Sequence, residues 1–333
     1  YFKKSNAKFF LISGEKGIGK TTLLQEIKTL AQGLGYLVLE IKPKTNQSSP
    51  SLLSQAIKTI NEFLQEKYPQ KVSALGPDLK QIEANLPKAI NFLQKISTLI
   101  PLVLLMDDLD LFEPVNLEFP KPEEISNPSF FILATCPGEF LEQKNSLISS
   151  FTKEFELEKA YQLNLSHLNF KQTRKFLSAK LPGAKLPPEF CNYVCQYSNG
   201  NGLYIREILK FLDNQKILTR VHGNWKVDLD KLSQAEIPPA LRILLLEAIN
   251  KYNPELTRIL ELASVLEDEF EQEALRFVTD LSFENSFEIL QKLLKDQILW
   301  AKKDPWGIKI KYSLANLALK KILYERLSHK PNL

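Results

Sequence analysis

The fold is decided by the stretch Gly14-Glu15-Lys16-Gly17-Ile18-Gly19-Lys20-Thr21-Thr22. Its beginning has the spacing G-x-x-x-x-G-K-[ST] of a P-loop. Glycines let successive backbone N–H groups turn inward around an anion, and a helix that begins near Lys20 adds the positive end of its dipole. We therefore expect this stretch to line the phosphates of a nucleotide, with Lys20 reaching the β- and γ-phosphates. The Thr21 hydroxyl is the expected magnesium ligand from this loop.

The residues on either side of this loop have the pattern that surrounds a P-loop, which is a strand before it and a helix after it. Residues 8–13 (KFFLIS) form a short apolar run, and residues 21–32 have the apolar spacing of a helix. Residues 37–41 (LVLEI) are a second expected strand, which follows two turn-forming glycines. The order is therefore strand, loop, helix and strand.

Further apolar runs predict the rest of an α/β sheet. They are residues 101–106, 130–134 and 161–165, and runs without polar alternation are typical of strands buried on both faces of a parallel sheet. Residues 51–97 look helical and form an expected insertion. Strands that alternate with helices predict a doubly wound P-loop NTPase fold with a five-stranded, mostly parallel sheet.

Acidic residues follow the third expected strand. Asp107 is placed to hold magnesium, because a carboxylate at the end of a neighbouring strand can complete the metal shell. Asp108 could orient or deprotonate the attacking water, with Asp110 as a weaker alternative. Thr135, after the fourth strand, could sense the γ-phosphate or could simply cap its strand. Lys20, Asp108 and Thr135 are thus the expected catalytic residues, although solvated acids at a strand end are the alternative.

Beyond residue 166 the pattern changes to helices. Residues 171–181, 188–197 and 204–214 predict a helical lid, followed by a hairpin at 221–227. The remaining expected elements are helices at 239–250, 254–266, 270–278 and 286–296, a hairpin at 298–303 and 308–312, and a helix at 315–327. We therefore expect three domains: a nucleotide-binding domain at 1–165, an all-α lid at 166–220 and a winged-helix-like α+β module at 221–333.

The amino-acid composition limits the class of protein and the compartment in which we expect it. Hydrophobic content of 44% and charged content of 25% are ordinary for a soluble globular protein, and no apolar run has transmembrane length. Three cysteines favour a reducing, cytoplasmic compartment, and Cys191 with Cys195 predicts helix packing. The chain opens at Tyr1, so we expect a fragment of a longer polypeptide, whose other domains would be partners. The basic end, with eight Lys/Arg against two acids from residue 301 onward, could be a nucleic-acid face or a solvated surface.

The whole pattern resembles the STAND class of signal-transduction ATPases, which are relatives of AAA+ and origin-recognition ATPases. The resemblance covers most of the chain and rests on the P-loop, the acidic strand end and later stretches: YQLNLSHLNFKQTRKFL (161–177), NGNGLYIREILKFLDNQKIL (199–218), HGNWKV (222–227), IPPALR (237–242), LELASVL (260–266) and YSLANLALKKILYERL (312–327). It implies an ATPase module of the kind attached to class III nucleotide cyclases and bacterial regulators, with ATP/ADP and Mg²⁺ as cofactors.

The sequence departs from the family pattern at three places. Gly202 stands where the family has a proline that contacts the base, so Gly202 is the expected base-side residue. Thr135-Cys136-Pro137 stands where many relatives place an arginine near the γ-phosphate, which makes hydrolysis less secure than binding. Asn316 stands where a histidine is usual.

From these features we expect the chain to work as a conformational switch that responds to the bound nucleotide. ATP would bridge the nucleotide domain to the lid and the winged-helix module through contacts to its γ-phosphate, for which Thr135 and Arg206 are candidates. Two alternatives stay open: a DNA-binding initiator that uses the winged helix and Trp306, and a catalytically dead scaffold. Nucleotide-dependent self-association is a further possibility, and no membrane contact is expected.

Overall fold

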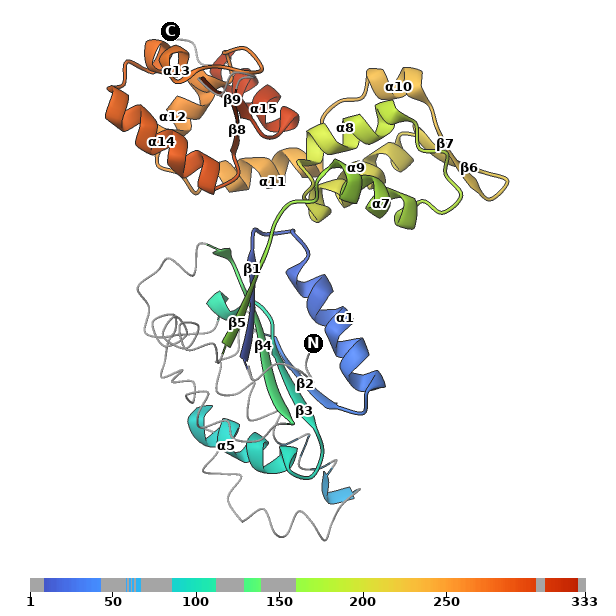
Figure 1. The fold of residues 1–333 in the computed structure, drawn as a ribbon. Helices are drawn as coiled ribbons and strands as arrows, with labels where there is room; N and C mark the ends of the chain where they lie inside the picture. Colours follow the sequence, from blue (N-terminus) through green and yellow to red (C-terminus); the bar gives the residue numbers. More distant parts are fainter. Residues whose placement is uncertain are drawn as a thin grey trace. The chain divides into compact units, whose positions relative to one another are not determined.

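The computed structural model describes residues 9–42, 58, 60, 62, 64–66, 86–111, 129–138, 160–303 and 309–328. The chain divides into two compact units, Tyr1–Ser166 and His167–Leu333 (Figure 1). Among the described residues, no helix combines the length and the apolar character that crossing a membrane requires.

The first unit contains a five-stranded sheet. Its strands are β1 (Phe9–Gly14), β2 (Leu37–Ile41), β3 (Leu102–Met106), β4 (Phe130–Cys136) and β5 (Ala160–Leu165). They lie in the order β2-β3-β4-β1-β5, and every neighbouring pair is parallel. Every residue of β3 and β4 is buried, as continuous apolar runs predict. The α/β P-loop NTPase fold is thus confirmed, with a sheet that is parallel throughout.

Helices cover the sheet. Helix α1 (Lys20–Gly33) packs Leu24 and Ala31 into a core with side chains of β1, β3 and β4. Helix α5 (Leu86–Ser97) contacts β3 and lies on the other face of the sheet in Figure 1. A short 3₁₀ turn, η2 (Leu109–Leu111), follows β3. Most of the expected insertion at 51–97 lies outside the described residues.

The second unit begins with three helices at the segments where the sequence predicts a lid. They are α7 (Phe170–Lys180), α8 (Pro188–Ser198) and α9 (Gly202–Asn214). Asn169 and Gln172 form a capping box at the start of α7. Asn201 caps α9, which therefore begins two residues earlier than its apolar spacing predicts. A hairpin of β6 (Leu218–Val221) and β7 (Asn224–Val227) follows, and then a short helix, α10 (Leu229–Ser233), that the sequence analysis missed.

The rest of the second unit is a group of helices with a late hairpin. Its elements are α11 (Pro239–Ile249), α12 (Pro254–Ala263), α13 (Gln272–Thr279), α14 (Phe283–Lys295), β8 (Leu299–Lys303), β9 (Ile310–Leu314) and α15 (Leu317–Ser328). An isolated antiparallel bridge joins Phe270 to Tyr312 of β9. The winged-helix-like character expected of this module stays a prediction. Residues 304–308, between the two strands of this hairpin, lie outside the described residues.

One hydrophobic core runs through the whole second unit. It joins Leu177, Phe190 and Ile208 of α7, α8 and α9 to Leu260 and Leu323 of the later helices. The side-chain amide of Asn316 donates a 2.9 Å hydrogen bond to the carbonyl oxygen of Tyr197 in α8. The expected division of this unit at residue 220 stays a prediction.

Candidate functional site

The loop between β1 and α1 has the backbone that its glycines predict. Gly17 and Gly19 have φ angles of 84° and 116°, in the region that favours glycine. A Cβ on Gly14 would lie 2.8 Å from the carbonyl oxygen of Leu165, so only glycine fits there. Helix α1 begins at Lys20, and the cap residue before it, Gly19, provides no side-chain hydrogen bond. Its first backbone N–H groups are therefore available to an anion.

Lys20 lies across this loop. Its side-chain amine donates to the carbonyl oxygens of Gly14 at 3.0 Å and Glu15 at 3.1 Å. Burial lowers the pKa of Lys20, while the nearby carboxylate of Asp108 acts in the opposite direction. The loop thus keeps a buried cation beside its open helix terminus, which suits a polyanionic ligand.

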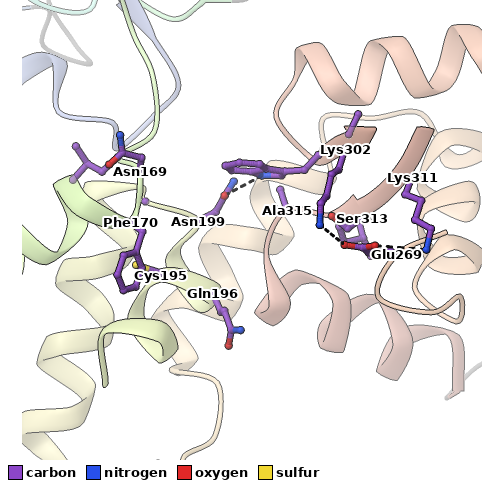
Figure 2. Close-up of a pocket in the computed structure, with 15 residues that line it drawn as sticks. Asn169, Phe170, Cys195, Gln196, Asn199, Glu269, Lys302, Lys311, Ser313 and Ala315 are labelled. Atoms are coloured by element: carbon purple, nitrogen blue, oxygen red, sulfur yellow. Dashed lines mark hydrogen bonds and ion pairs between the residues drawn. The ribbon is translucent and has the colours of Figure 1, made fainter. Parts of the chain in front are cut away.

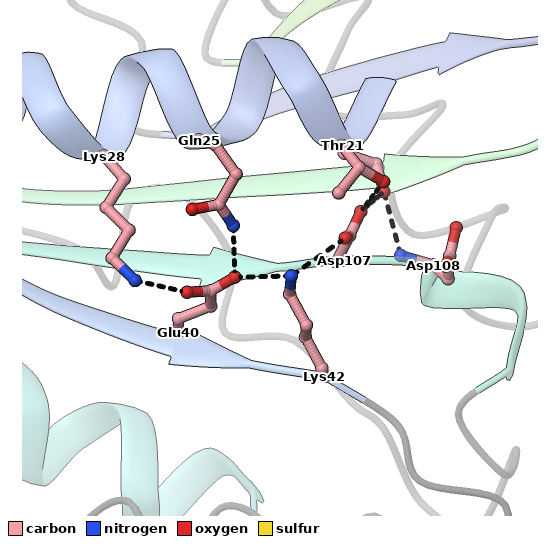
Figure 3. A network of polar contacts seen from close by, with 8 residues as sticks. Thr21, Gln25, Lys28, Glu40, Lys42, Asp107 and Asp108 are labelled. Carbon is pink, nitrogen blue, oxygen red and sulfur yellow. Dashed lines mark hydrogen bonds and ion pairs between the residues drawn. The ribbon is translucent and has the colours of Figure 1, made fainter. Parts of the chain in front are cut away.

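Asp107 is the centre of the site (Figure 3). Its buried carboxylate oxygen Oδ1 accepts hydrogen bonds from the hydroxyls of Thr21 at 3.2 Å and Thr135 at 2.7 Å. The structure therefore brings together three residues that the sequence predicts for one site. The oxygens of Thr21 and Asp107 are hard donors of the kind that Mg²⁺ prefers, so these two residues fit the metal.

Thr135 is fully buried and its hydroxyl is engaged. The hydroxyl donates its proton to Asp107 and accepts the backbone N–H of Asp108 at 2.8 Å. This geometry makes Thr135 a positioning residue for Asp107. Its predicted contact with a γ-phosphate stays a prediction.

Asp108 turns the chain out of the sheet. It adopts a left-handed conformation with φ of 53°, which aspartate tolerates better than most residues. Burial raises the pKa of Asp108, and the neighbouring charges of Asp107 and Asp110 add to the shift. Burial also raises the pKa of Asp110. A carboxylate with a raised pKa is a better proton acceptor than an ordinary one, which suits the role predicted for Asp108.

A network of charges that the sequence analysis missed adjoins Asp107 (Figure 3). Glu40 of β2 accepts hydrogen bonds from Lys28 and Gln25 of α1, both at 2.6 Å, and pairs with Lys42 at 2.9 Å. Lys42 Nζ also lies 3.8 Å from Asp107 Oδ2. The signal was available, because β2 and β3 are neighbours and Lys42 directly follows the end of β2.

These contacts shift both pKa values of the Glu40–Lys42 pair. Burial by itself would raise the pKa of Glu40, but hydrogen bonds from Lys28, Lys42 and Gln25 lower it to about 2. The hydrogen bond to Glu40 raises the pKa of Lys42. A positive charge is therefore held next to the expected magnesium ligand.

Gly202 lies in the second unit, as the first residue of α9. The cap residue before it, Asn201, is fully buried and accepts the backbone N–H groups of Leu203 and Tyr204. The predicted place of Gly202 beside a base stays a prediction. Cys191 is buried in the core of the second unit, as expected from its helical spacing.

Comparisons with known proteins give one family match and several similar solved structures. Residues 3–120 match the family model described as AAA ATPase domain. A search of the curated proteins gave no match. Similar solved structures include a STAND protein with a tetratricopeptide repeat sensor from Pyrococcus horikoshii, at 16% identity and a TM-score of 0.42 over 96% of this chain. This chain spans 41% of the length of that protein.

Two further solved structures are similar to this chain. Drosophila ORC bound to DNA has 14% identity and a TM-score of 0.43, covering 96% of this chain and 81% of that one. AMPPCP-bound DnaA from Aquifex aeolicus has 15% identity and a TM-score of 0.42, covering 89% of this chain and 85% of that one. The family match covers residues 3–120, and both the P-loop at residues 14–21 and the acid that follows β3 lie within it, so this part of the chain is similar to an AAA ATPase domain.

Proposed function

We propose that this chain binds ATP with magnesium at the P-loop and works as a slow, regulatory ATPase module of the STAND type. The observation that carries the proposal is the cluster of Thr21, Asp107 and Thr135 beside the buried amine of Lys20. A nucleoside triphosphate with its metal requires oxygen ligands for the metal and positive charge for the phosphates. The two oxygen ligands and the cation at the open start of a helix meet these requirements.

Thr21 and Asp107 would hold the metal in this proposal. When bound, Mg²⁺ would neutralise charge on the β- and γ-phosphates. Lys20 would leave its two backbone carbonyl partners for phosphate oxygens, and Thr135 would keep Asp107 in place. Asp108 would orient the attacking water and accept its proton. No arginine occurs in Thr135-Cys136-Pro137, which supports slow turnover.

The regulatory part of the proposal is that nucleotide state sets the arrangement of the two units within a larger signalling protein. Contacts to the γ-phosphate that ADP lacks would supply the free-energy difference between the arrangements. Arg206 of α9 is a candidate for such a contact, since 71% of its side chain is exposed and its pairing with Glu207 is long, at 3.6 Å.

Nucleotide binding can be tested with a fluorescent ATP analogue and a magnesium titration. Lys20→Ala should weaken binding about 100-fold, because it removes a charge-assisted contact to phosphate. Lys226→Ala, which removes an exposed lysine of β7, is the matched control. Unchanged affinity in Lys20→Ala would contradict the proposal at its centre.

A measurement of ATP hydrolysis distinguishes an active regulatory ATPase from a scaffold that only binds nucleotide. Phosphate release should fall at least tenfold in Asp108→Asn, since the amide cannot accept a proton. Equal release by the wild type and Asp108→Asn would favour a scaffold that keeps nucleotide for stability.

DNA binding by the basic hairpin is the weaker alternative. Lys309 pairs with Glu271 at 2.9 Å, and Lys302 and Lys311 both lie within 4 Å of Glu269. These acids offset much of the charge that phosphate contacts would need. Trp306, its other support, lies outside the described residues. A salt-dependent mobility shift with random duplex DNA would revive this alternative.

A further inference from the structure

The second unit contains a pocket that is separate from the P-loop (Figure 2). Its volume is about 600 Å³, within the range of pockets that hold small molecules. Figure 2 shows Asn169, Phe170 and Asn199 on one side of it, and Lys302 and Lys311 on the other.

Two aromatic side chains line this pocket. Phe170, the first residue of α7, is 48% exposed, and Trp300 of β8 is 55% exposed. The indole N–H of Trp300 donates to the side-chain oxygen of Asn199 at 3.2 Å, which fixes the ring without covering it. Half-exposed aromatic rings in a pocket provide surfaces on which a flat ligand can stack.

The hairpin adds two lysines to the same pocket. Lys302 and Lys311 stand directly opposite each other in the β8–β9 register, and like charges at such positions destabilise a hairpin. Glu269 lies 3.7 Å from Lys302 and 3.8 Å from Lys311. One carboxylate between two lysines leaves one unit of positive charge. The fold accepts an unfavourable pair here, which is a reason to look for an anionic ligand.

The charge and the aromatic surface are close enough to serve one small molecule. Trp300 and Lys302 are two residues apart on β8, so they share a face of the hairpin about 7 Å apart. Ser313, opposite Trp300 in the register, is half-buried, and its hydroxyl has no hydrogen-bond partner among the described residues. A ligand could therefore stack its ring on Trp300 and place an acid group between the lysines and Ser313.

We propose that this pocket binds a small planar aromatic anion. Its ring lies against Trp300 and Phe170, and its carboxylate, sulfonate or phosphate lies at Lys302 and Lys311, where it competes with Glu269. Because the pocket is lined by both the lid helices and the hairpin, such a ligand ties these two parts together. This site does not depend on nucleotide binding at the P-loop.

The test uses the full chain and the fluorescent probe 1-anilinonaphthalene-8-sulfonate, which has an aromatic ring and an anionic group. The probe should bind with one-to-one stoichiometry, and Lys302→Gln/Lys311→Gln should weaken its affinity at least fivefold. Lys303→Gln/Lys309→Gln is the matched control, because it removes the same charge from the same hairpin at residues that do not line the pocket. Equal affinities in the two double variants would overturn the proposal.

Two further measurements separate the ring contact from the charge contact. Energy transfer from tryptophan to the bound probe should fall in Trp300→Phe and persist in Trp225→Phe, and the reverse result would place the probe elsewhere. The neutral analogue N-phenyl-1-naphthylamine should not distinguish the two double variants.

Competition then identifies the acid group and the class of ligand. Aromatic carboxylates and aromatic phosphates, added separately, should displace the probe, and the stronger competitor names the acid group. If only single-stranded DNA displaces it, the hairpin is a nucleic-acid surface and the small-molecule proposal fails.

Discussion

The Thr135 hydroxyl donates a 2.7 Å hydrogen bond to Asp107 across neighbouring strands β4 and β3. Both residues are buried. The hydrogen bond therefore replaces part of the solvation that the Asp107 carboxylate loses on burial, and it also fixes the orientation of that carboxylate. The same hydroxyl accepts the backbone N–H of Asp108. One threonine therefore sets the orientation of the expected magnesium ligand and the start of the turn that carries the expected base.

Thr135→Val should reduce both stability and magnesium affinity. Valine has the same shape but leaves Asp107 and the Asp108 N–H without this partner, which should cost about 1–3 kcal/mol in the free energy of unfolding. Urea unfolding and a magnesium titration of nucleotide binding measure the two effects. Thr135→Ser keeps the hydroxyl and should restore magnesium affinity; a serine variant as weak as valine would count against the hydrogen bond.

Lys42→Met should strengthen magnesium binding. The Lys42 amine lies 3.8 Å from Asp107 Oδ2 and competes electrostatically with a divalent cation. Because 46% of the lysine side chain is exposed, we expect a gain of about two- to fivefold. Lys28→Met is the control, since Lys28 pairs with Glu40. The same gain in both variants would show that Glu40, and not proximity to Asp107, is responsible.

Glu40 should make stability depend on pH in the acid range. Its pKa is about 2 in the folded chain against an ordinary 4.5, so the folded state favours the charged form. The resulting stability is present above about pH 4.5 and is lost as the pH falls toward 2. Allowing for screening of these partly exposed pairs, the loss should be on the order of 1–2 kcal/mol.

Urea unfolding between pH 7 and pH 3 checks this dependence on Glu40. Glu40→Gln should flatten the acid limb of the stability curve. Glu26→Gln changes an exposed glutamate of α1 and should leave the curve as it is. An unchanged acid limb in Glu40→Gln would assign the loss of stability to other carboxylates.

The sequence could predict the parts of the site that follow from local pattern. The loop at residues 14–21 has a spacing that the backbone requires, and Asp107 ends an apolar strand whose neighbours are predictable. The contact between Thr21 and Asp107 follows once both are placed at the carboxyl edge of one sheet.

The sequence could not predict which side chains are engaged with each other. The pairing of Lys42 with Glu40 and Asp107 depends on rotamers and on the order of strands. Asn316 stands where the family pattern has a histidine. Its side-chain oxygen caps the start of α15 by accepting the backbone N–H of Leu319, and its side-chain amide donates to the carbonyl oxygen of Tyr197. Such double roles arise from tertiary packing, which local periodicity does not encode.

Gly200→Ala should destabilise the second unit severely. Gly200 has φ of 72°, and a Cβ on it would lie 2.0 Å from the carbonyl oxygen of Leu168. The backbone N–H of Leu168 also donates to the carbonyl oxygen of Gly200 at 3.0 Å, so neither segment can move without losing this bond. We expect a loss above about 4 kcal/mol, the range in which a specific structural clash is the usual cause.

Gly223→Ala separates the clash from backbone strain. Gly223 has a similar φ of 82°, but a Cβ on it would meet nothing within 4 Å. This variant should therefore lose only about 1 kcal/mol, which is the cost of a left-handed conformation for alanine. Urea unfolding of both variants measures the difference. Equal losses would mean that strain accounts for Gly200 too, and that the turn before α9 is looser than its contact with Leu168 implies.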